Sequence, residues 1–214
     1  MNGKGASDLF EAVRRSRVFG NIVRRFALDR VKVLDVGCSE GHHLQCFGEG
    51  SVGVTIIPEH VAAAGARGLR VLLANVEDPQ FDLGERFDVL WVNNLFEHLN
   101  APHTFLVRLR DLVEPSGTLI LGVPVIPHLS FLTRFKKFRG VYAVSHVNFF
   151  TRRTLIETVR SAGWTVREAR LFYFRSPLLD RFLNPIAPHI YVVASPDRNF
   201  GYAEKRLRSL AGYA

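Results

Sequence analysis

The chain has 214 residues, of which 47% are hydrophobic and 22% charged, a composition typical of a globular domain with one full core. Its longest uncharged run, residues 115–133, is interrupted by prolines and glycines, which excludes a membrane-spanning helix there. The N-terminus lacks the apolar core of a secretory signal, so we expect one domain over 1–214 and a cytoplasmic location.

Charge is unevenly distributed along the chain. Residues 1–32 carry 8 basic and 3 acidic side chains, 33–130 carry 5 and 12, and 131–214 carry 15 and 5; the net values of +5, −7 and +10 sum to +8. The basic flanks favour an anionic acceptor or surface, and a solvated arginine-rich exterior is the alternative. The two cysteines, Cys38 and Cys46, have no second pair to complete a zinc site, so we expect both to be reduced and structural.

In the N-terminal segment 1–30, apolar residues recur at helical spacing over 7–27 with arginines between them. This pattern predicts one basic amphipathic helix, broken near Gly20. We expect it to pack across the mouth of a ligand site; contact with an anionic membrane surface is the alternative.

From residue 31 onward, short apolar runs alternate with helical patterns, which predicts a parallel sheet covered by helices. The expected helices are 41–47, 58–66, 103–113 and 151–161. The expected strands are 31–36, 51–56, 70–74, 87–92, 118–123, 164–173 and 189–195. A proline-containing connection lets the last two of these seven strands form an antiparallel hairpin.

The turn after the first strand, residues 35–41, reads Asp-Val-Gly-Cys-Ser-Glu-Gly. Glycines let the backbone approach a ligand closely, and a helix that follows presents free N–H groups to it. The spacing differs from the Gly-x-Gly-x-x-Gly fingerprint of dehydrogenases, and no acid ends the second strand, so a dehydrogenase is disfavoured.

This turn resembles the first motif of class I S-adenosylmethionine-dependent methyltransferases, acid-x-Gly-x-Gly-x-Gly. Later segments resemble further landmarks of that family in the family's order: 53–59, 72–78, 87–98, 109–121 and 146–164. The likeness covers about residues 30–170 and is to the subgroup that includes quinone-biosynthesis and small-molecule methyltransferases. It implies an α/β, Rossmann-like, seven-stranded and mostly parallel sheet of order 3-2-1-4-5-7-6, with strand 7 antiparallel and helices on both faces.

The resemblance also implies S-adenosylmethionine as the cofactor and assigns residues to its parts. The methionyl group is assigned Asp35, Gly37, Cys38 and Gly41, and the ribose is assigned Thr55 and Ile56. The adenine is assigned Asn75 and Val76, and the sulfonium end is assigned Asn93 and Phe96.

Two positions depart from the family pattern. Ser39 replaces the middle glycine, which costs about 1–2 kcal/mol if that position needs a positive φ, although its hydroxyl can add a contact to the cofactor. Thr55 replaces the acid that clasps the ribose hydroxyls, so a charge-assisted pair is lost. Both changes predict weaker binding of the cofactor.

Residues 124–150 interleave aromatic with basic side chains and are predicted to form a cap over the acceptor pocket. The alternative is a small helix with its phenylalanines in the core. Methyl transfer needs no metal, but an oxygen or nitrogen acceptor needs a base, and histidine has a suitable pKa. Of His98, His128 and His146 we favour His146, which begins the segment that resembles the subgroup's acceptor side, and then His98. A structural role for each stays open.

We therefore expect a methyltransferase acting on an oxygen of a small acceptor, anionic or membrane-associated, such as a glycan, lipid or natural-product intermediate. The basic flanks favour a nucleic-acid methyltransferase as an alternative, but residues 93–96 lack the Asn-Pro-Pro-aromatic signature of base-amino methyltransferases. A degenerate binding or scaffold protein is the other alternative. Nucleic acid is not the expected partner, peripheral membrane contact is permitted, and the sequence does not determine the oligomeric state.

Overall fold

A sheet of eight strands forms the centre of the protein in a computed structural model that describes residues 3–201. The strands are β1 (Val33–Val36), β2 (Val52–Thr55), β3 (Val71–Leu73), β4 (Phe87–Asn93), β5 (Val113–Ile126), β6 (Phe150–Thr151), β7 (Trp164–Arg170) and β8 (His189–Pro196). The ends of the expected 1–214 domain, residues 1–2 and 202–214, lie outside the described part, as do the side chains of residues 3–7, Lys136, Lys137 and Arg139.

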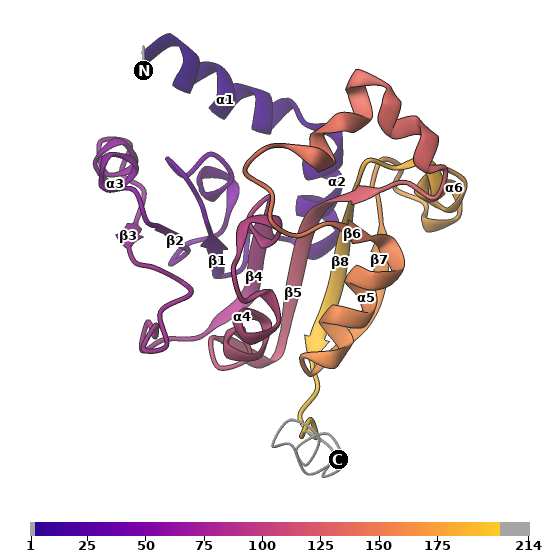
Figure 1. The fold of residues 1–214 in the computed structure, drawn as a ribbon. Coiled ribbons are helices and arrows are strands. Elements are labelled where there is room, and N and C mark those ends of the chain that lie inside the picture. Colours follow the sequence, from indigo (N-terminus) through magenta and orange to yellow (C-terminus); the bar gives the residue numbers. More distant parts are fainter. Residues whose placement is uncertain (1–2, 202–214) are drawn as a thin grey trace.

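The strand order is β3-β2-β1-β4-β5-β8-β7 (Figure 1). The first five strands are parallel, and β8 runs antiparallel to both β5 and β7. This confirms the predicted order and the antiparallel last strand. The short β6, which pairs with β5, adds an eighth strand that the sequence did not predict.

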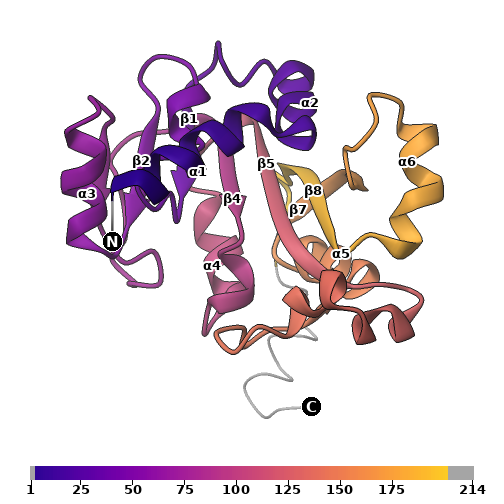
Figure 2. The same ribbon diagram turned by 90° about the horizontal axis from the view of Figure 1, so that it is seen from above.

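Alternating side chains of each strand feed two hydrophobic layers, because successive residues point to opposite faces of a sheet. In β4, Leu90 and Val92 belong to one layer and Val89 and Trp91 to the other. The helices α4 (Pro102–Leu109) and α5 (Arg152–Ser161) cover the first face, and α2 (Arg17–Phe26) covers the second (Figure 2). The predicted covering of both faces by helices is confirmed.

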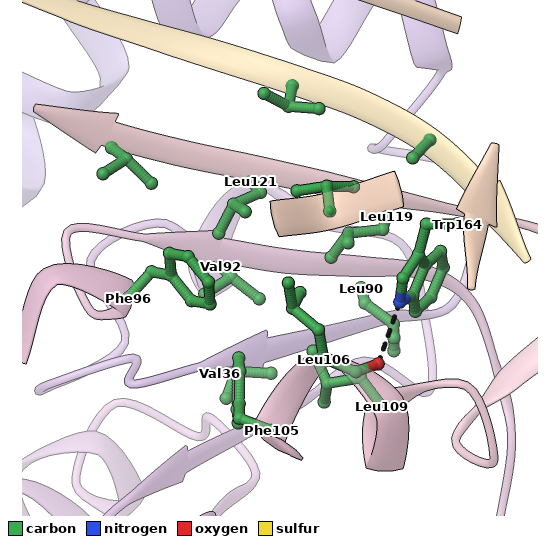
Figure 3. Packing of buried hydrophobic residues seen from close by; sticks show 14 of the residues in the cluster. Val36, Leu90, Val92, Phe96, Phe105, Leu106, Leu109, Leu119, Leu121 and Trp164 are labelled. Atoms are coloured by element: carbon green, nitrogen blue, oxygen red, sulfur yellow. Dashed lines mark hydrogen bonds between the residues drawn. The ribbon is translucent and has the colours of Figure 1, made fainter. Parts of the chain in front are cut away.

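Trp164, at the start of β7, closes one end of the first layer, at the right of the view in Figure 3. Its indole Nε1 donates a hydrogen bond of 2.8 Å to the Leu106 carbonyl oxygen of α4. A buried tryptophan needs such a partner for its N–H, and the bond fixes α4 against the sheet.

The N-terminal segment forms two helices, α1 (Gly3–Arg15) and α2, and the predicted break at Gly20 is wrong. Ser16 separates them in an extended conformation, and its hydroxyl accepts a hydrogen bond from the Phe19 N–H at 3.3 Å. Serine competes for backbone groups in this way and so favours helix starts. Gly20 stays inside α2, where its N–H donates to the Ser16 carbonyl.

The predicted helix over 41–47 is also wrong, because β1 is followed by turns and a single 3-10 turn, η1 (Leu44–Cys46). Gly41 has a φ of +85°, and the Gly48 N–H bonds to the Leu28 carbonyl oxygen. Only six residues lie between these fixed glycines, too few to offset the cost of nucleating an α-helix. The helix α3 (Pro58–Gly65) follows β2 as expected.

The segment 127–149 lies beyond the carboxyl end of β5, which continues to Ile126 and so takes the first three residues of the predicted cap. It contains η3 (Ser130–Arg134) and η4 (Lys136–Tyr142). Phe131 and Phe135 are 55% and 59% exposed, so these two phenylalanines do not enter the core.

The remaining elements complete the carboxyl edge of the sheet. The turn η2 (Phe96–His98) follows β4, and β7 ends at Arg170, three residues earlier than predicted. The helices α6 (Pro177–Leu183) and η5 (Asn184–Ile186) connect β7 to β8. Within residues 3–201, no helix combines the length and hydrophobicity needed to cross a bilayer.

Candidate functional site

A cavity of about 310 Å³ opens at the carboxyl ends of β1, β2 and β3. Six of the predicted cofactor residues line it: Gly37, Ser39, Thr55, Ile56, Asn75 and Val76. The other lining residues are Val54, Ile57, His60, Ala74, Glu77, Leu95, His98 and Leu99. In a parallel α/β sheet, this edge is where ligands bind.

The glycine-rich turn has three residues in the left-handed region: Gly37 at φ +75°, Ser39 at +53° and Gly41 at +85°. The middle position therefore carries the strain expected for a non-glycine residue, about 1–2 kcal/mol. A Cβ atom at Gly37 would lie 3.1 Å from the Leu95 side chain. Glycine is thus required there to keep the turn close to the β4–η2 loop without closing the cavity.

The remaining predicted cofactor residues do not line the cavity: Asp35, Cys38, Gly41, Asn93 and Phe96. Asp35 and Asn93 are nevertheless notable, because Oδ2 of Asp35 and Oδ1 of Asn93 are buried and have no hydrogen-bond partner among the described residues. Burial raises the pKa of Asp35 to about 8. Both atoms are polar groups for which a ligand would supply the missing partner.

Cys38 and Phe96 face the core. The Cys38 sulfur packs against Gly53 of β2, where a Cβ atom would be only 2.6 Å away, and burial raises the pKa of the thiol. Phe96 stacks on Phe150 with ring centroids 5.1 Å apart. Cys38 and Cys46 are both free, as expected.

His60 also lines the cavity, although it is not among the predicted site residues. Its Nδ1 lies 3.4 Å from Oγ1 of Thr55, which also accepts a hydrogen bond from the Ile57 N–H. Its position in the sequence could have predicted this, since a polar residue in the first turn of the helix after β2 lies over the end of that strand. Thr55 and His60 together place a hydroxyl and an imidazole where the family pattern has one carboxylate.

Glu97, His98 and His146 form a cluster beside the cavity. The Glu97 Oε1 lies 3.8 Å from Nε2 of His98 and 3.9 Å from Nε2 of His146, and the imidazole centroids are 4.8 Å apart. Nδ1 of His98 lies 2.9 Å from the Ser145 carbonyl oxygen, and Nδ1 of His146 lies 2.9 Å from the Val141 carbonyl oxygen. Both Nδ1 atoms therefore donate, which leaves both Nε2 atoms as the basic nitrogens facing one carboxylate.

The segment 141–148 holds this cluster together by docking on η2. The N–H groups of Val147 and Asn148 both donate to the Glu97 carbonyl oxygen at 3.0 Å, and Asn148 Nδ2 donates to the Leu99 carbonyl at 2.6 Å. The Glu97 side chain is 2% exposed, and desolvation raises its pKa against the opposing effects of its own backbone and the two histidines.

The cluster could also hold a divalent cation, because one ligand atom from each of its three residues lies within 4.8 Å of the others. His128 is not part of it. That histidine lines a separate cavity with Arg152, Arg153 and Arg181, between the end of β5 and α6.

Residues 10–169 match the protein family described as Methyltransferase domain, which is most of the chain. The chain belongs to this family. The membership, with the sheet order above, confirms the predicted class I S-adenosylmethionine-dependent methyltransferases and their cofactor.

The chain is similar to two curated relatives whose names give different activities. The ubiquinone biosynthesis O-methyltransferase of Azorhizobium caulinodans is 32% identical over 115 residues, 50% of this chain and 46% of the relative. The tRNA U34 carboxymethyltransferase of Vibrio campbellii is 30% identical over 125 residues, 51% of this chain and 39% of the relative. The methyltransferase chain thus spans less than half the length of either.

Solved structures share the fold at low sequence identity. An S-adenosylmethionine-dependent methyltransferase of Clostridium acetobutylicum gives a TM-score of 0.66 at 8% identity, covering 90% of this chain and 98% of that chain. A putative methyltransferase of Haloferax volcanii, solved with the activator Trm112, gives 0.64 at 17% identity, covering 90% and 95%.

The residues of this methyltransferase fit S-adenosylmethionine. The cavity offers apolar walls at Val76 and Leu99 for a purine and polar groups at Thr55 and Asn75. The buried, unpartnered Asp35 Oδ2 suits the cationic methionyl end, because an ammonium would satisfy it. The Asn75 Oδ1 already accepts from the Glu77 N–H at 3.0 Å, so its amide nitrogen is the group left for the ligand.

Proposed function

We propose that the protein transfers the methyl group of S-adenosylmethionine to an oxygen of a small, anionic acceptor. The observation that carries this proposal is the pair of basic Nε2 atoms in His98, which lines the cofactor cavity, and in His146, whose ring lies 4.8 Å from that of His98. The bound cofactor supplies a methyl group already activated by a positive sulfur. The protein then has to align the acceptor, exclude water and remove a proton.

The predicted cofactor residues other than Cys38, Gly41 and Phe96 remain the proposed contacts. Gly37 and Ser39 hold the methionyl end with Asp35 behind them, Thr55 and Ile56 hold the ribose, and Asn75 and Val76 hold the adenine. Asn93, at the end of β4, is the proposed residue at the sulfonium end.

His146 is the proposed base, with His98 as the second candidate. Its Nδ1–H is fixed by the Val141 carbonyl, so the imidazole is held in the tautomer that accepts a proton at Nε2. The Glu97 carboxylate, 3.9 Å from that atom, stabilises the imidazolium that forms. The acceptor hydroxyl approaches between the cavity and the segment 141–148, which is part of the cap predicted over 124–150.

The test uses S-adenosylmethionine labelled in its methyl group, with a small-metabolite extract and total tRNA as separate acceptor pools. We expect label in the small-metabolite pool. A His146→Gln variant should lower kcat by about 10²–10⁴, the usual contribution of a general base, with S-adenosylhomocysteine binding retained. Unchanged transfer by that variant would remove His146 as the base.

A parallel reaction in EDTA tests the cluster itself. A direct base needs no metal, so the rate should not change. Loss of activity in EDTA, restored by Mn²⁺, would instead assign Glu97, His98 and His146 to a bound cation.

Nucleic-acid methylation is the second candidate, favoured by the likeness to the tRNA U34 carboxymethyltransferase and by the basic flanks. Label in the tRNA pool would replace the small-molecule proposal. Failure to bind S-adenosylhomocysteine would leave the scaffold role.

A further inference from the structure

A further cavity, of about 330 Å³, opens between α2, the end of β7 and the loop that follows β7. Its six lining residues include four arginines. The six are Asn21, Arg24, Arg25, Arg170, Phe174 and Arg175. Because β7 is the edge strand farthest from β3, this cavity lies at the opposite end of the sheet from the cofactor cavity. Figure 2 shows α2 and α6 on the side of the molecule away from α3.

The buried Asn21 ties the walls of this arginine cavity together. Its Nδ2 donates to the carbonyl oxygens of Phe172 and Tyr173, both at 3.0 Å, so α2 and the loop after β7 are joined. Its Oδ1 accepts from Nη2 of Arg24 at 2.8 Å. One buried amide therefore fixes both the backbone of the loop and the direction of one arginine.

Arg170 is the most firmly held of the four arginines, with a side chain only 5% exposed. Its Nε donates to Glu168 at 2.9 Å, and its Nη1 donates to Asp180 at 2.5 Å and to the Phe174 carbonyl at 3.2 Å. Its guanidinium also lies 3.8 Å from the ring centroid of Phe172, a residue at the left-handed φ of +57°. These contacts fix the position of the Arg170 guanidinium without a ligand. The left-handed φ of Phe172 is a local backbone strain in the same loop.

The cavity has more positive than negative charge. Glu168 is shared by Arg170 and Arg25, whose Nε lies 2.9 Å from the other carboxylate oxygen, and Asp180 pairs with Arg170. Among the residues that line the cavity and their ion-pair partners, there are thus four guanidinium groups and two carboxylates. Arg175 is exposed and makes no ion pair with any residue in the described part of the chain. Convergent arginines repel one another unless an anion lies between them.

We propose that the arginine cavity binds the phosphate monoester group of a small phosphorylated ligand. Guanidinium groups present paired N–H donors that match phosphate oxygens, and the charge excess of two matches a phosphate dianion. A terminal phosphate can enter a concave site with Asn21 and Arg170 in its walls, whereas a phosphodiester continues through the ligand on both sides. The site is separate from methyl transfer and does not depend on it.

The experiment titrates the full chain with phenyl phosphate, inorganic phosphate, dimethyl phosphate and a single-stranded RNA oligonucleotide by calorimetry. We expect saturable binding of phenyl phosphate. Dimethyl phosphate, a diester that carries one charge less, should bind at least about tenfold more weakly. Arg175→Gln and Arg24→Gln should each weaken binding by about tenfold. The matched control is Arg30→Gln, an arginine with 82% of its side chain exposed, which should bind like the wild type.

Three results would overturn the proposal. Equal losses in Arg30→Gln would show unspecific charge attraction, and binding of inorganic phosphate alone would show an ion site without a larger ligand. Binding of the RNA more tightly than of phenyl phosphate would assign the arginines to nucleic acid. S-adenosylhomocysteine binding should be equal in all variants, which separates failure here from failure of the methyltransferase proposal.

Discussion

Ser39 has a backbone conformation that is energetically unfavourable for a residue with a Cβ atom. It sits at φ +53° where the family pattern has glycine, so Ser39→Gly should stabilise the protein by about 1 kcal/mol, because glycine adopts this conformation without strain. Ser39→Ala keeps the Cβ atom and should give no gain. Urea unfolding of the three proteins measures the effect, and a stabilised alanine variant would contradict it.

Thr55 is the second departure from the family pattern, and its effect should appear in affinity. Thr55→Asp restores a carboxylate that can accept from both ribose hydroxyls, so we expect S-adenosylhomocysteine to bind about tenfold more tightly. Thr55→Asn provides the same shape without the charge and should give little gain. If the aspartate variant binds more weakly, the ribose does not lie at Thr55.

The sequence predicted the backbone conformation of the glycine-rich turn better than it predicted which side chains face the cavity. The family pattern pointed to a cost at Ser39 if this position needed a positive φ, and the structure meets that condition. That Cys38 and Phe96 face the core did not follow from the pattern, because the side of a turn to which a side chain points depends on the packing of Gly53 and Phe150. His60 differs from these two, because its place in the first turn of α3 is a local signal that the prediction did not use.

At the scale of elements, the start of α2 depends on one side chain. Ser16→Ala removes the hydroxyl that accepts from the Phe19 N–H, so it should destabilise the protein by about 1 kcal/mol. Thermal unfolding followed by circular dichroism measures this loss. Ser16→Asp, which retains a cap oxygen, should be close to wild type, and an equal loss in both variants would show that the cap contributes nothing.

The first four strands and the middle of β5 were predictable because they are short, mostly apolar runs, and a parallel sheet buries both faces of its strands. The helix over 41–47 was not, because its amphipathic pattern gave no weight to the positions of Gly41 and Gly48. The contact of 141–148 with η2 involves residues about 50 positions apart. Only the resemblance to a family placed His146 near the site, and nothing in the spacing brought Glu97 to it.

At the scale of the whole molecule, buried ionisable groups set the pH dependence of stability. Burial raises the pKa of Asp35 to about 8 from 3.8, so the unfolded chain loses this proton before the folded protein does, and stability falls as the pH rises through this window. Burial lowers the pKa of His43 and of His189 to about 4 from 6.5, so stability also falls as the pH drops below 6.5.

We therefore expect the free energy of unfolding to be greatest near pH 6.5. Asp35→Asn mimics the protonated carboxyl and should flatten the decline on the alkaline side, whereas Asp111→Asn, at an exposed position, should leave it unchanged. Urea titrations from pH 4 to pH 9 measure the profile. An unaltered alkaline decline in Asp35→Asn would exclude Asp35 as its source.

The central claim is that the cavity at the ends of β1, β2 and β3 binds S-adenosylmethionine, and calorimetric titration with S-adenosylhomocysteine tests it most directly. The wild type should bind one equivalent. Gly37→Ala should bind at least about tenfold more weakly, because its Cβ atom meets Leu95 at 3.1 Å beside the cavity. Gly68→Ala has the same backbone strain, at φ +73°, with nothing within 4 Å of the new atom, and should bind like the wild type. Absence of binding to the wild type at millimolar ligand, or equal losses in both variants, would contradict the claim.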